Sequence, residues 1–384
     1  MKRLNVFIIV ALSAIVFASC KKDSMLMNSE AAGKAMSNAK NPEESTGPGA
    51  VYLLDNAAAG NHVLVYNRST SGQLSPAGNF ATGGTGTGSG LGSQGAVILD
   101  NSNQYLYAVN AGSNEISSFR VSADGLTWVD KIASGGTMPI SLTIHNNVLY
   151  VLNAGGMGGI HGFSVSQGHL TSIAGSHQAL STAASGPAQV QFNNPGTELV
   201  VTEKATNTID VYPVVNGVAG SRVSYPSVGE TPFGFAFGKK DELVVADAYG
   251  GMPGLSALTS YSLNKMGDLG LISGPVGTMQ TAACWVVITN NGRFAYTSNT
   301  GSASISGYSI DNDGMISMLN SNGVTGSTGM SPSDMALSNN SRFLYSRNGG
   351  SNSISIFEVQ ATGALSNLGT VTGLPSGSVG IAAK

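Results

Sequence analysis

Charged residues are scarce in this sequence, at 10% of 384 positions against roughly 25% in average globular chains. The net charge is −3, and no run of Lys or Arg follows the first residues. Because affinity for phosphates needs clustered cations, we expect no nucleic acid among the partners. Glycine is abundant instead, with 52 residues, about twice its usual share. Such a composition favours many short strands joined by tight turns and predicts an all-β fold.

Cysteine is almost absent, since Cys20 and Cys284 are the only two. No disulfide framework follows from such a pair, and Cys284 lies in an apolar strand where a buried, unreactive thiol is expected. The sequence also has no Gly-x-Ser-x-Gly, Walker or His-Glu-x-x-His motif, and its five histidines lack the spacing of metal ligands. We therefore expect neither a metal nor a cofactor.

The first 19 residues have the order of a secretory signal peptide. Met1-Lys2-Arg3 is basic, Val6 to Phe17 is apolar and too short to span a bilayer comfortably, and Ala18-Ser19-Cys20 follows. This layout resembles a bacterial lipoprotein signal, which implies cleavage before Cys20 and acylation of that residue. The alternative is a plain signal peptide followed by a chance cysteine. We expect an exported protein, lipid-anchored in the bacterial cell envelope, with the membrane as a partner.

Residues 20–49 follow as an acylated cysteine and a flexible tether. They are rich in Lys, Ser, Asn, Glu, Ala and Gly and show no sustained apolar period. A flexible coil of this length reaches roughly 30 Å. The tether therefore allows the folded body, residues 50–384, to stand away from the membrane.

One pattern recurs from Val51 to the end of the chain. Each unit has a strand, a short turn, a second strand ending in a polar residue, a third strand ending in an aromatic and a weaker fourth strand. These units recur on average about every 49 residues, which indicates four-stranded propeller blades. Seven residues end the second strands and serve as markers of the blades: Asn56, Asn110, Asn153, Glu203, Asp247, Asn299 and Asn348. The sequence therefore predicts a seven-bladed β-propeller.

The two ends of the body predict how the ring closes. The first unit begins directly with its second strand, AVYLLDN, and has no first strand of its own. The chain ends with residues 377–383, which resemble the first strands of the other units. We expect the C-terminal strand to complete the first blade, which removes strand edges that would otherwise promote aggregation.

Several segments resemble one known family. They are GLGSQGAVILD (90–100), VNAGSNEISSFRV (109–121), LVVTEKATNTIDVY (199–212), TPFGFAF (231–237) and QTAACWVVITNNGRFAYTSNTGSASISGY (280–308). They are similar to lactonase-like seven-bladed propellers, a family that includes bacterial 6-phosphogluconolactonases and fungal carboxymuconate lactonizing enzymes. The resemblance implies a propeller over about residues 51–384, but a shared fold does not by itself establish an activity.

The resemblance also implies where catalytic residues belong. The enzymes of the family carry a His after the first-strand proline of one blade, an Arg-His pair after that of the next, and a glutamate at the end of that blade's second strand. This sequence has Ile140, Ala188 and Gln189 in place of the basic residues and keeps only Glu203. Lactone hydrolysis needs a base for water and donors for the developing oxyanion, so the departure puts that chemistry in doubt.

The markers and the residues after each first-strand proline are expected to converge at one mouth of the channel, the default ligand site of a propeller. Asn at a marker position has a structural role available, because it hydrogen-bonds its own turn and tolerates left-handed geometry. Glu203 and Asp247 differ, and they lie in adjacent blades. Two nearby carboxylates can share a proton, bind a cation or act as acid and base; exposed, solvated carboxylates are the alternative.

Loop length also places the candidate site near the blades of Glu203 and Asp247. From Asp247 to the aromatic Tyr261 there are 14 positions, against 9 or 10 in the other units, and long loops on rigid scaffolds are often functional. We expect loop 248–260 to overhang the mouth beside Glu203, the candidate catalytic base. The candidate ligand-binding residues are Gln189, Lys204, Phe233, Asp247, Trp285, Asp334 and Arg347. The alternatives are inter-blade packing for Phe233 and Trp285, and a structural pairing of Arg347 with Asp334.

Residues 90–95, GLGSQG, match a dinucleotide-binding glycine pattern, but a strand follows them where that motif requires a helix. We expect residues 82–95 to form a mobile loop between blades. Two functions remain: a ligand-binding or scaffolding lipoprotein without the lactonase catalytic set, or a hydrolase of a sugar or aromatic-acid lactone with Glu203 as base. Its partner is then a small polar metabolite or an envelope macromolecule at the mouth.

Overall fold

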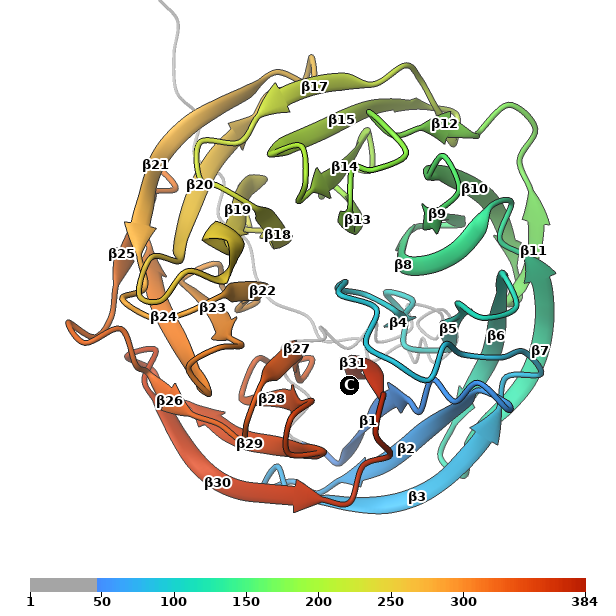
Figure 1. The fold of residues 1–384 in the computed structure, drawn as a ribbon. Coiled ribbons are helices and arrows are strands. Elements are labelled where there is room, and N and C mark those ends of the chain that lie inside the picture. The colour runs from blue at the N-terminus through green and yellow to red at the C-terminus, as the bar shows by residue number, and fades with distance from the viewer. Residues whose placement is uncertain (1–46) are drawn as a thin grey trace, which may run out of the picture. The chain divides into compact units, whose positions relative to one another are not determined.

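Seven antiparallel sheets, the blades, surround a central channel in the computed structural model, which describes residues 47–384 (Figure 1). The first strand of each blade lines the channel: β31 (Val379–Ala383), β4 (Val97–Leu99), β8 (Thr137–His145), β13 (Pro187–Phe192), β18 (Pro232–Phe237), β22 (Ala283–Ile288) and β27 (Pro332–Leu337). The prediction of a seven-bladed propeller with four-stranded blades is confirmed. Cys20 and the predicted signal peptide lie outside the described residues.

The remaining strands continue each blade outward. The second strands are β1 (Gly49–Leu54), β5 (Tyr105–Asn110), β9 (Val148–Gly155), β14 (Glu198–Glu203), β19 (Glu242–Asp247), β23 (Phe294–Asn299) and β28 (Phe343–Asn348). The third strands are β2 (His62–Arg68), β6 (Glu115–Ser122), β10 (Gly159–Ser166), β15 (Thr208–Val215), β20 (Ala257–Leu263), β24 (Ser304–Ile310) and β29 (Ser353–Val359). The outer strands are β3 (Leu74–Ala81), β7 (Gly125–Ala133), β11 (His169–Ser172) with β12 (Gln178–Ala179), β16 (Val218–Ala219) with β17 (Val223–Pro226), β21 (Leu269–Gly277), β25 (Ile316–Met318) with β26 (Gly326–Ser327), and β30 (Leu365–Thr372).

The ring closes as the sequence predicts. The sheet of the first blade has the order β3-β2-β1-β31, so β31 pairs with β1, the first strand of the described residues. Tyr52 is opposite Ala382, and Val51 is opposite Ala383. The guanidinium of Arg68 on β2 donates to the carbonyl of Lys384 at 3.1 Å, which holds Lys384 against the first blade.

The second strands are buried on both faces because neighbouring blades pack face to face. All six residues of β14, β19, β23 and β28 are buried, so these strands form continuous buried runs. The outer strands β3 and β30 do alternate, since one face meets solvent. Each third strand adds a buried aromatic to the contact between blades: Tyr66, Phe119, Phe163, Tyr212, Tyr261, Tyr308 and Phe357.

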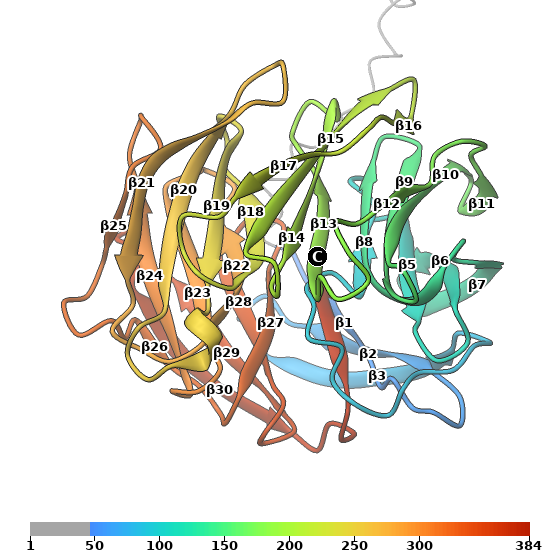
Figure 2. The same ribbon diagram turned by 45° about the horizontal axis from the view of Figure 1, so that its top comes forward.

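Between residues 47 and 384 no helix is long and apolar enough to cross a membrane. The described helical element is a short 3₁₀ turn, η2 (Tyr249–Gly251), in the connection between β19 and β20. Figure 2 shows this turn on one face of the propeller.

Candidate functional site

The turns after the second strands and the connections between blades meet at one mouth of the channel. In blade after blade, the first amide beyond the second strand donates to the carbonyl of the preceding connection. Examples are Lys204 to Gly186 at 3.2 Å, Ala248 to Thr231 at 3.0 Å and Thr300 to Ala282 at 2.9 Å. This repeated bond holds the candidate site residues on one face, as the sequence predicts.

Residues 88–95, which we call the plug segment, fill this mouth. Figure 1 shows the chain between β3 and β4 reaching into the centre of the ring. The amide of Gln94 donates to the carbonyl of Ala188 at 3.1 Å, and the amide of Leu142 donates to the carbonyl of Gly95 at 2.9 Å. The Ser93 hydroxyl donates to Ile140 at 2.8 Å. The segment that we expected to be a mobile loop between two blades is therefore hydrogen-bonded to β8 and β13 as well.

The other side of the plug segment is held by β22. The Gln94 side chain forms two bonds with the backbone of Val286: its amide nitrogen donates to the carbonyl at 2.7 Å, and its oxygen accepts from the amide at 3.0 Å. The indole of Trp285 donates to the carbonyl of Ser93 at 2.8 Å. Residue 234 must be glycine here, because a Cβ would lie 2.3 Å from the Gln94 side-chain oxygen.

Lys204 adds a cationic contact to the plug segment. Its ammonium donates to the carbonyls of Gly92, at 2.7 Å, and Pro187, at 2.9 Å, and lies 4.5 Å from the centre of the Phe233 ring. Burial lowers the pKa of Lys204 to about 8. Phe233 in turn packs against Trp285 with 4.9 Å between ring centres. The structure thus brings Lys204, Phe233 and Trp285 together, but around the protein's own backbone.

Glu203, the candidate base, is fully buried between blades. Its carboxylate accepts from the Ser181 amide at 2.8 Å, from the Ser181 hydroxyl, and from the Thr206 hydroxyl at 2.7 Å. Burial alone would raise the pKa of Glu203, but these hydrogen bonds outweigh it and the pKa lies below its ordinary value. A buried carboxylate with a lowered pKa is a weak base for water.

Asp247 is also fully buried, and it shares no hydrogen-bond partner with Glu203. It accepts from the Thr259 hydroxyl on β20 at 2.5 Å, whereas Glu203 is bonded to Ser181 and Thr206. Burial raises the pKa of Asp247 to about 8, although the Thr259 bond opposes the rise. Each carboxylate therefore bonds hydroxyls nearby, and neither is one of the exposed, solvated groups considered from the sequence.

The other markers show what this position does. Asn299 donates to the hydroxyl of Ser306 at 2.9 Å, and Asn348 donates to that of Ser355 at 2.9 Å, in both cases from the second strand to the third. Of the seven markers, Asn56 alone has a left-handed backbone, with φ of 52°. The left-handed geometry expected of the five Asn markers is therefore wrong for Asn110, Asn153, Asn299 and Asn348. In four blades the marker thus joins the second strand to the third, through Asn110, Asp247, Asn299 and Asn348, whereas Asn153 and Glu203 bond Ser134 and Ser181 in the connection from the preceding blade.

Gln189, at a position where the family carries histidine, is engaged in the same way as Gln94. Its amide nitrogen donates to the carbonyl of Phe235, and its oxygen accepts from the Phe235 amide, at 2.9 and 2.8 Å. Ile140 and Ala188, at the other two family positions, are 1% and 0% exposed. These positions connect neighbouring first strands.

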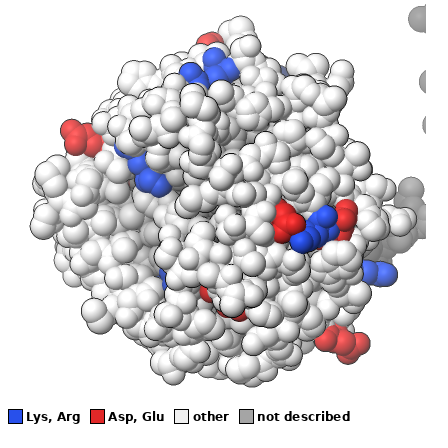
Figure 3. Space-filling model, turned by 45° about the vertical axis from the view of Figure 1, so that its right-hand side comes forward, with Lys and Arg blue, Asp and Glu red and all other residues white. Residues whose placement is uncertain are grey.

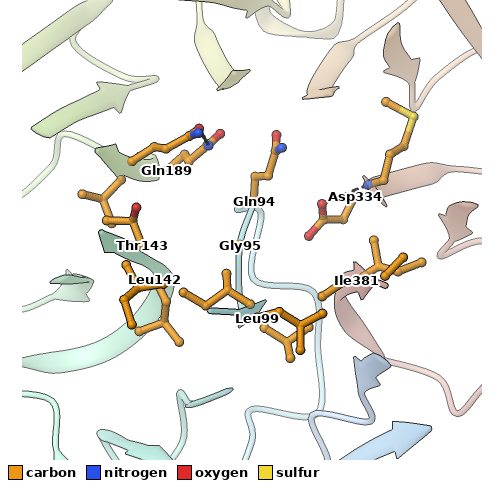
Figure 4. A pocket seen from close by; sticks show the side chains of 16 residues that line it. Gln94, Gly95, Leu99, Leu142, Thr143, Gln189, Asp334 and Ile381 are labelled. Atoms are coloured by element: carbon orange, nitrogen blue, oxygen red, sulfur yellow. Dashed lines mark hydrogen bonds between the residues drawn. The ribbon is translucent and has the colours of Figure 1, made fainter. Parts of the chain in front are cut away.

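Asp334 and Arg347, from the last blade, line a cavity of about 70 Å³ beneath the plug segment, together with Trp285. Arg347 donates to the Ser333 hydroxyl at 2.5 Å, and within the described residues no ion pair within 4.0 Å joins it to Asp334. Asp334 also lines a second cavity of about 290 Å³ in the channel, which Gln189 borders and which Figure 4 shows. Glu203 and Asp247 border neither cavity.

The sequence reasoning missed Gln94, Ser181 and Asp210. Asp210 packs against Glu203, and burial, with the nearby Glu203 charge, raises its pKa to about 7 although Ser224 hydrogen-bonds it. No pattern in the sequence marks Ser181, since it bonds a residue 22 positions away. Gln94 was visible in GLGSQG, but the connection to Val286 spans 192 positions. Between residues 47 and 384, no three His, Cys, Asp or Glu side chains gather to hold a metal.

Comparison with known families gives one match. The model of the family described as "Lactonase, 7-bladed beta-propeller" matches residues 51–174 and 257–379. The unmatched stretch between them, 175–256, contains Gln189, Glu203, Lys204, Phe233 and Asp247. No curated protein matches this chain.

Solved structures share the fold at low sequence identity. A candidate 6-phosphogluconolactonase of Bacteroides fragilis is 17% identical, with a TM-score of 0.67 over 88% of this chain and 98% of that one. The periplasmic gluconolactonase of Pseudomonas aeruginosa is 17% identical, with a TM-score of 0.66 over 86% and 98%. A hypothetical selenium-binding protein of Sulfolobus tokodaii is 10% identical, with a TM-score of 0.64 over 88% and 95%. At these identities the likeness establishes the fold alone.

Proposed function

This chain belongs to the lactonase family of seven-bladed β-propellers, and from that membership we propose that it is a ligand-binding or scaffolding module of the cell envelope without lactonase activity. The proposal rests on the roles that the residues at the family's catalytic positions have in this structure. Gln189 bonds the backbone of Phe235, and Glu203 is buried under three hydrogen bonds. Gln189 has no basic group, and Glu203 is fully buried with a lowered pKa, so neither side chain is suited to activate a water molecule.

The surface around the mouth supports binding of a partner. Exposed apolar side chains lie on its turns and connections: Met157, Val228, Met252, Leu255, Met279 and Met330. Flexible thioether side chains adapt to different partners, and exposed apolar groups often mark interaction sites. Charged side chains are sparse on the face shown in Figure 3.

A hydrolysis assay tests this proposal. We expect the protein to hydrolyse gluconolactone and 6-phosphogluconolactone no faster than buffer does, as measured by acid release in a pH-stat. Glu203→Gln should behave identically in this assay, and so should the control Glu230→Gln, at an exposed residue on the mouth face. Circular dichroism must show that each variant is folded, because Glu203 accepts three hydrogen bonds.

The second candidate function is lactone hydrolysis with Glu203 as base, which the family match favours. Under that function the wild-type protein turns over a lactone, and Glu203→Gln loses that turnover while Glu230→Gln keeps it. This result would overturn the binding proposal.

We also propose that Cys20 anchors the protein to the membrane, on the basic, apolar and Ala-Ser-Cys order of the first 20 residues. Cells grown with labelled palmitate should incorporate the label into the wild-type protein. Cys20→Ser should carry no label and should leave the membrane fraction, whereas the control Cys284→Ser should remain labelled. An unlabelled wild-type protein would show that the first residues act as a plain signal peptide.

A further inference from the structure

The central channel holds a cavity that none of the preceding functions uses. Its volume is about 290 Å³, near the lower end of cavities that bind small molecules, which run from roughly 300 to 1,000 Å³. Gln94 and Gly95 of the plug segment border it, and it extends along β4, β8, β13 and β31 as far as Leu99, Ile144 and Ala383. Sixteen residues line it, and Figure 4 shows side chains from several blades around it.

Asp334 is the only ionisable residue among those sixteen. It is 3% exposed, and Figure 4 shows its carboxylate pointing into the cavity. One oxygen, Oδ1, accepts from the Met335 amide at 2.9 Å, while Oδ2 is buried and has no well-aligned donor within 3.5 Å, although the amides of Gly95 and Ile381 lie near the carboxylate. A buried carboxylate oxygen without a donor is costly, so a ligand that supplies a donor gains free energy there.

The backbone directs this carboxylate into the channel. β27 has a bulge between Pro332 and Met335, and Asp334 within it has a φ of 58°, a conformation that favours glycine. Aspartate adopts that conformation more readily than most residues, because its short polar side chain can hydrogen-bond the local backbone, as Oδ1 does with the Met335 amide. The amides of Gly95 and Ile381 and the charge of Arg347 lower the pKa of Asp334, but burial outweighs them and raises it to about 7.

The remaining lining selects the chemical class of the ligand. The side-chain amides of Gln94 and Gln189 are occupied by backbone partners, so they leave little for the several hydroxyls of a sugar. Aliphatic side chains, among them Leu99, Leu142 and Ile381, share the walls with the polar side chains of Thr143, Gln189 and Gln191. A single carboxylate among aliphatic walls is complementary to a positive group on an apolar body, since an ammonium supplies three donors and no acceptor.

We propose that the channel cavity binds a small primary amine, with its ammonium on Asp334 Oδ2 and its apolar body along the aliphatic walls. The proposal goes beyond the function proposed above, because it concerns the channel rather than the mouth and holds with or without lactone hydrolysis.

Calorimetric titration of the full-length protein with n-hexylamine, hexan-1-ol and hexanoate tests this site. Hexylamine should bind, hexanol should bind at least about tenfold more weakly, and hexanoate should not bind, because only the amine pairs with the carboxylate. Asp334→Asn should lose hexylamine binding, whereas Asp130→Asn, far from the channel on β7, should retain it. Equal binding of hexylamine and hexanol, or binding that survives Asp334→Asn, would overturn the proposal.

Gln191 provides a second test that leaves Asp334 intact. It lines the same cavity, and its side chain is partly exposed. Gln191→Lys adds a competing positive charge and should abolish hexylamine binding, whereas Gln191→Glu adds a second carboxylate and should strengthen it. Because residue 191 lines the cavity, a folded Gln191→Lys protein that still binds hexylamine would place the amine elsewhere. The hexylamine titration does not measure lactone turnover, so a failure of the amine site can be distinguished from a failure of the proposed function.

Discussion

Asp247→Asn is expected to raise the melting temperature clearly at pH 8 and to change it little at pH 4. Burial raises the pKa of Asp247 from 3.8 to about 8 in the folded protein. As the pH rises from about 4 to about 8, the unfolded chain releases this proton while the folded protein keeps it, so stability falls across that window. Asparagine carries no titrating proton and removes this loss, which is on the order of 2 kcal/mol or more at pH 8.

The repeat itself supplies the reason why asparagine fits. At the equivalent marker positions Asn299 and Asn348 donate to hydroxyls of the third strand, and the side-chain amide introduced by Asp247→Asn would meet the Thr259 hydroxyl in the same way. Thermal denaturation followed by circular dichroism at pH 4, 6 and 8 measures the effect, with the exposed Asp313→Asn as control. A gain of equal size at all three pH values would show that Asp247 does not titrate in this window.

The fold was predictable because the information for it is local and repeated. Each unit has its own strand pattern and its own marker, and the missing first strand before Val51 and the extra strand at 377–383 together indicate the closure that the β1–β31 pairing confirms. A sevenfold repetition also averages out errors in single units. Strand burial was less predictable, since the packing of both faces depends on neighbouring blades.

The site was less predictable because its bonds join residues far apart in the sequence. Glu203 looked like a base, but its pKa is lowered by hydrogen bonds from Ser181, which lies in the connection between two blades. The plug segment looked like a glycine-rich loop, and its position depends on Gln94, Trp285 and Lys204. The sequence did gather Lys204, Phe233 and Trp285 at one mouth, because register places them there. It did not show what occupies the space between them.

Deleting residues 377–384 is expected to have the largest effect on stability. The deletion removes β31, with buried Val379 and Ile381, and exposes the edge of β1. Burial of a large aliphatic side chain contributes roughly 1.5–3 kcal/mol, so the loss is on the order of 5 kcal/mol before the exposed edge is counted. A typical domain has a total stability of only about 5–15 kcal/mol. We expect a melting temperature lower by more than about 10 °C, with aggregation on heating.

A relocated strand separates the loss of β31 from the loss of eight residues. In the other blades the first strand runs directly into the second, for example from Phe192 to Glu198 through five residues. Moving residues 377–384 in front of Gly49, joined by such a five-residue turn, gives the first blade the same order and keeps the antiparallel pairing with β1. This permuted protein should recover most of the lost melting temperature, because β1 is covered again and the ring is closed. A permuted protein as unstable as the truncated one would mean that closure depends on the continuous connection from β30, and not on the strand itself.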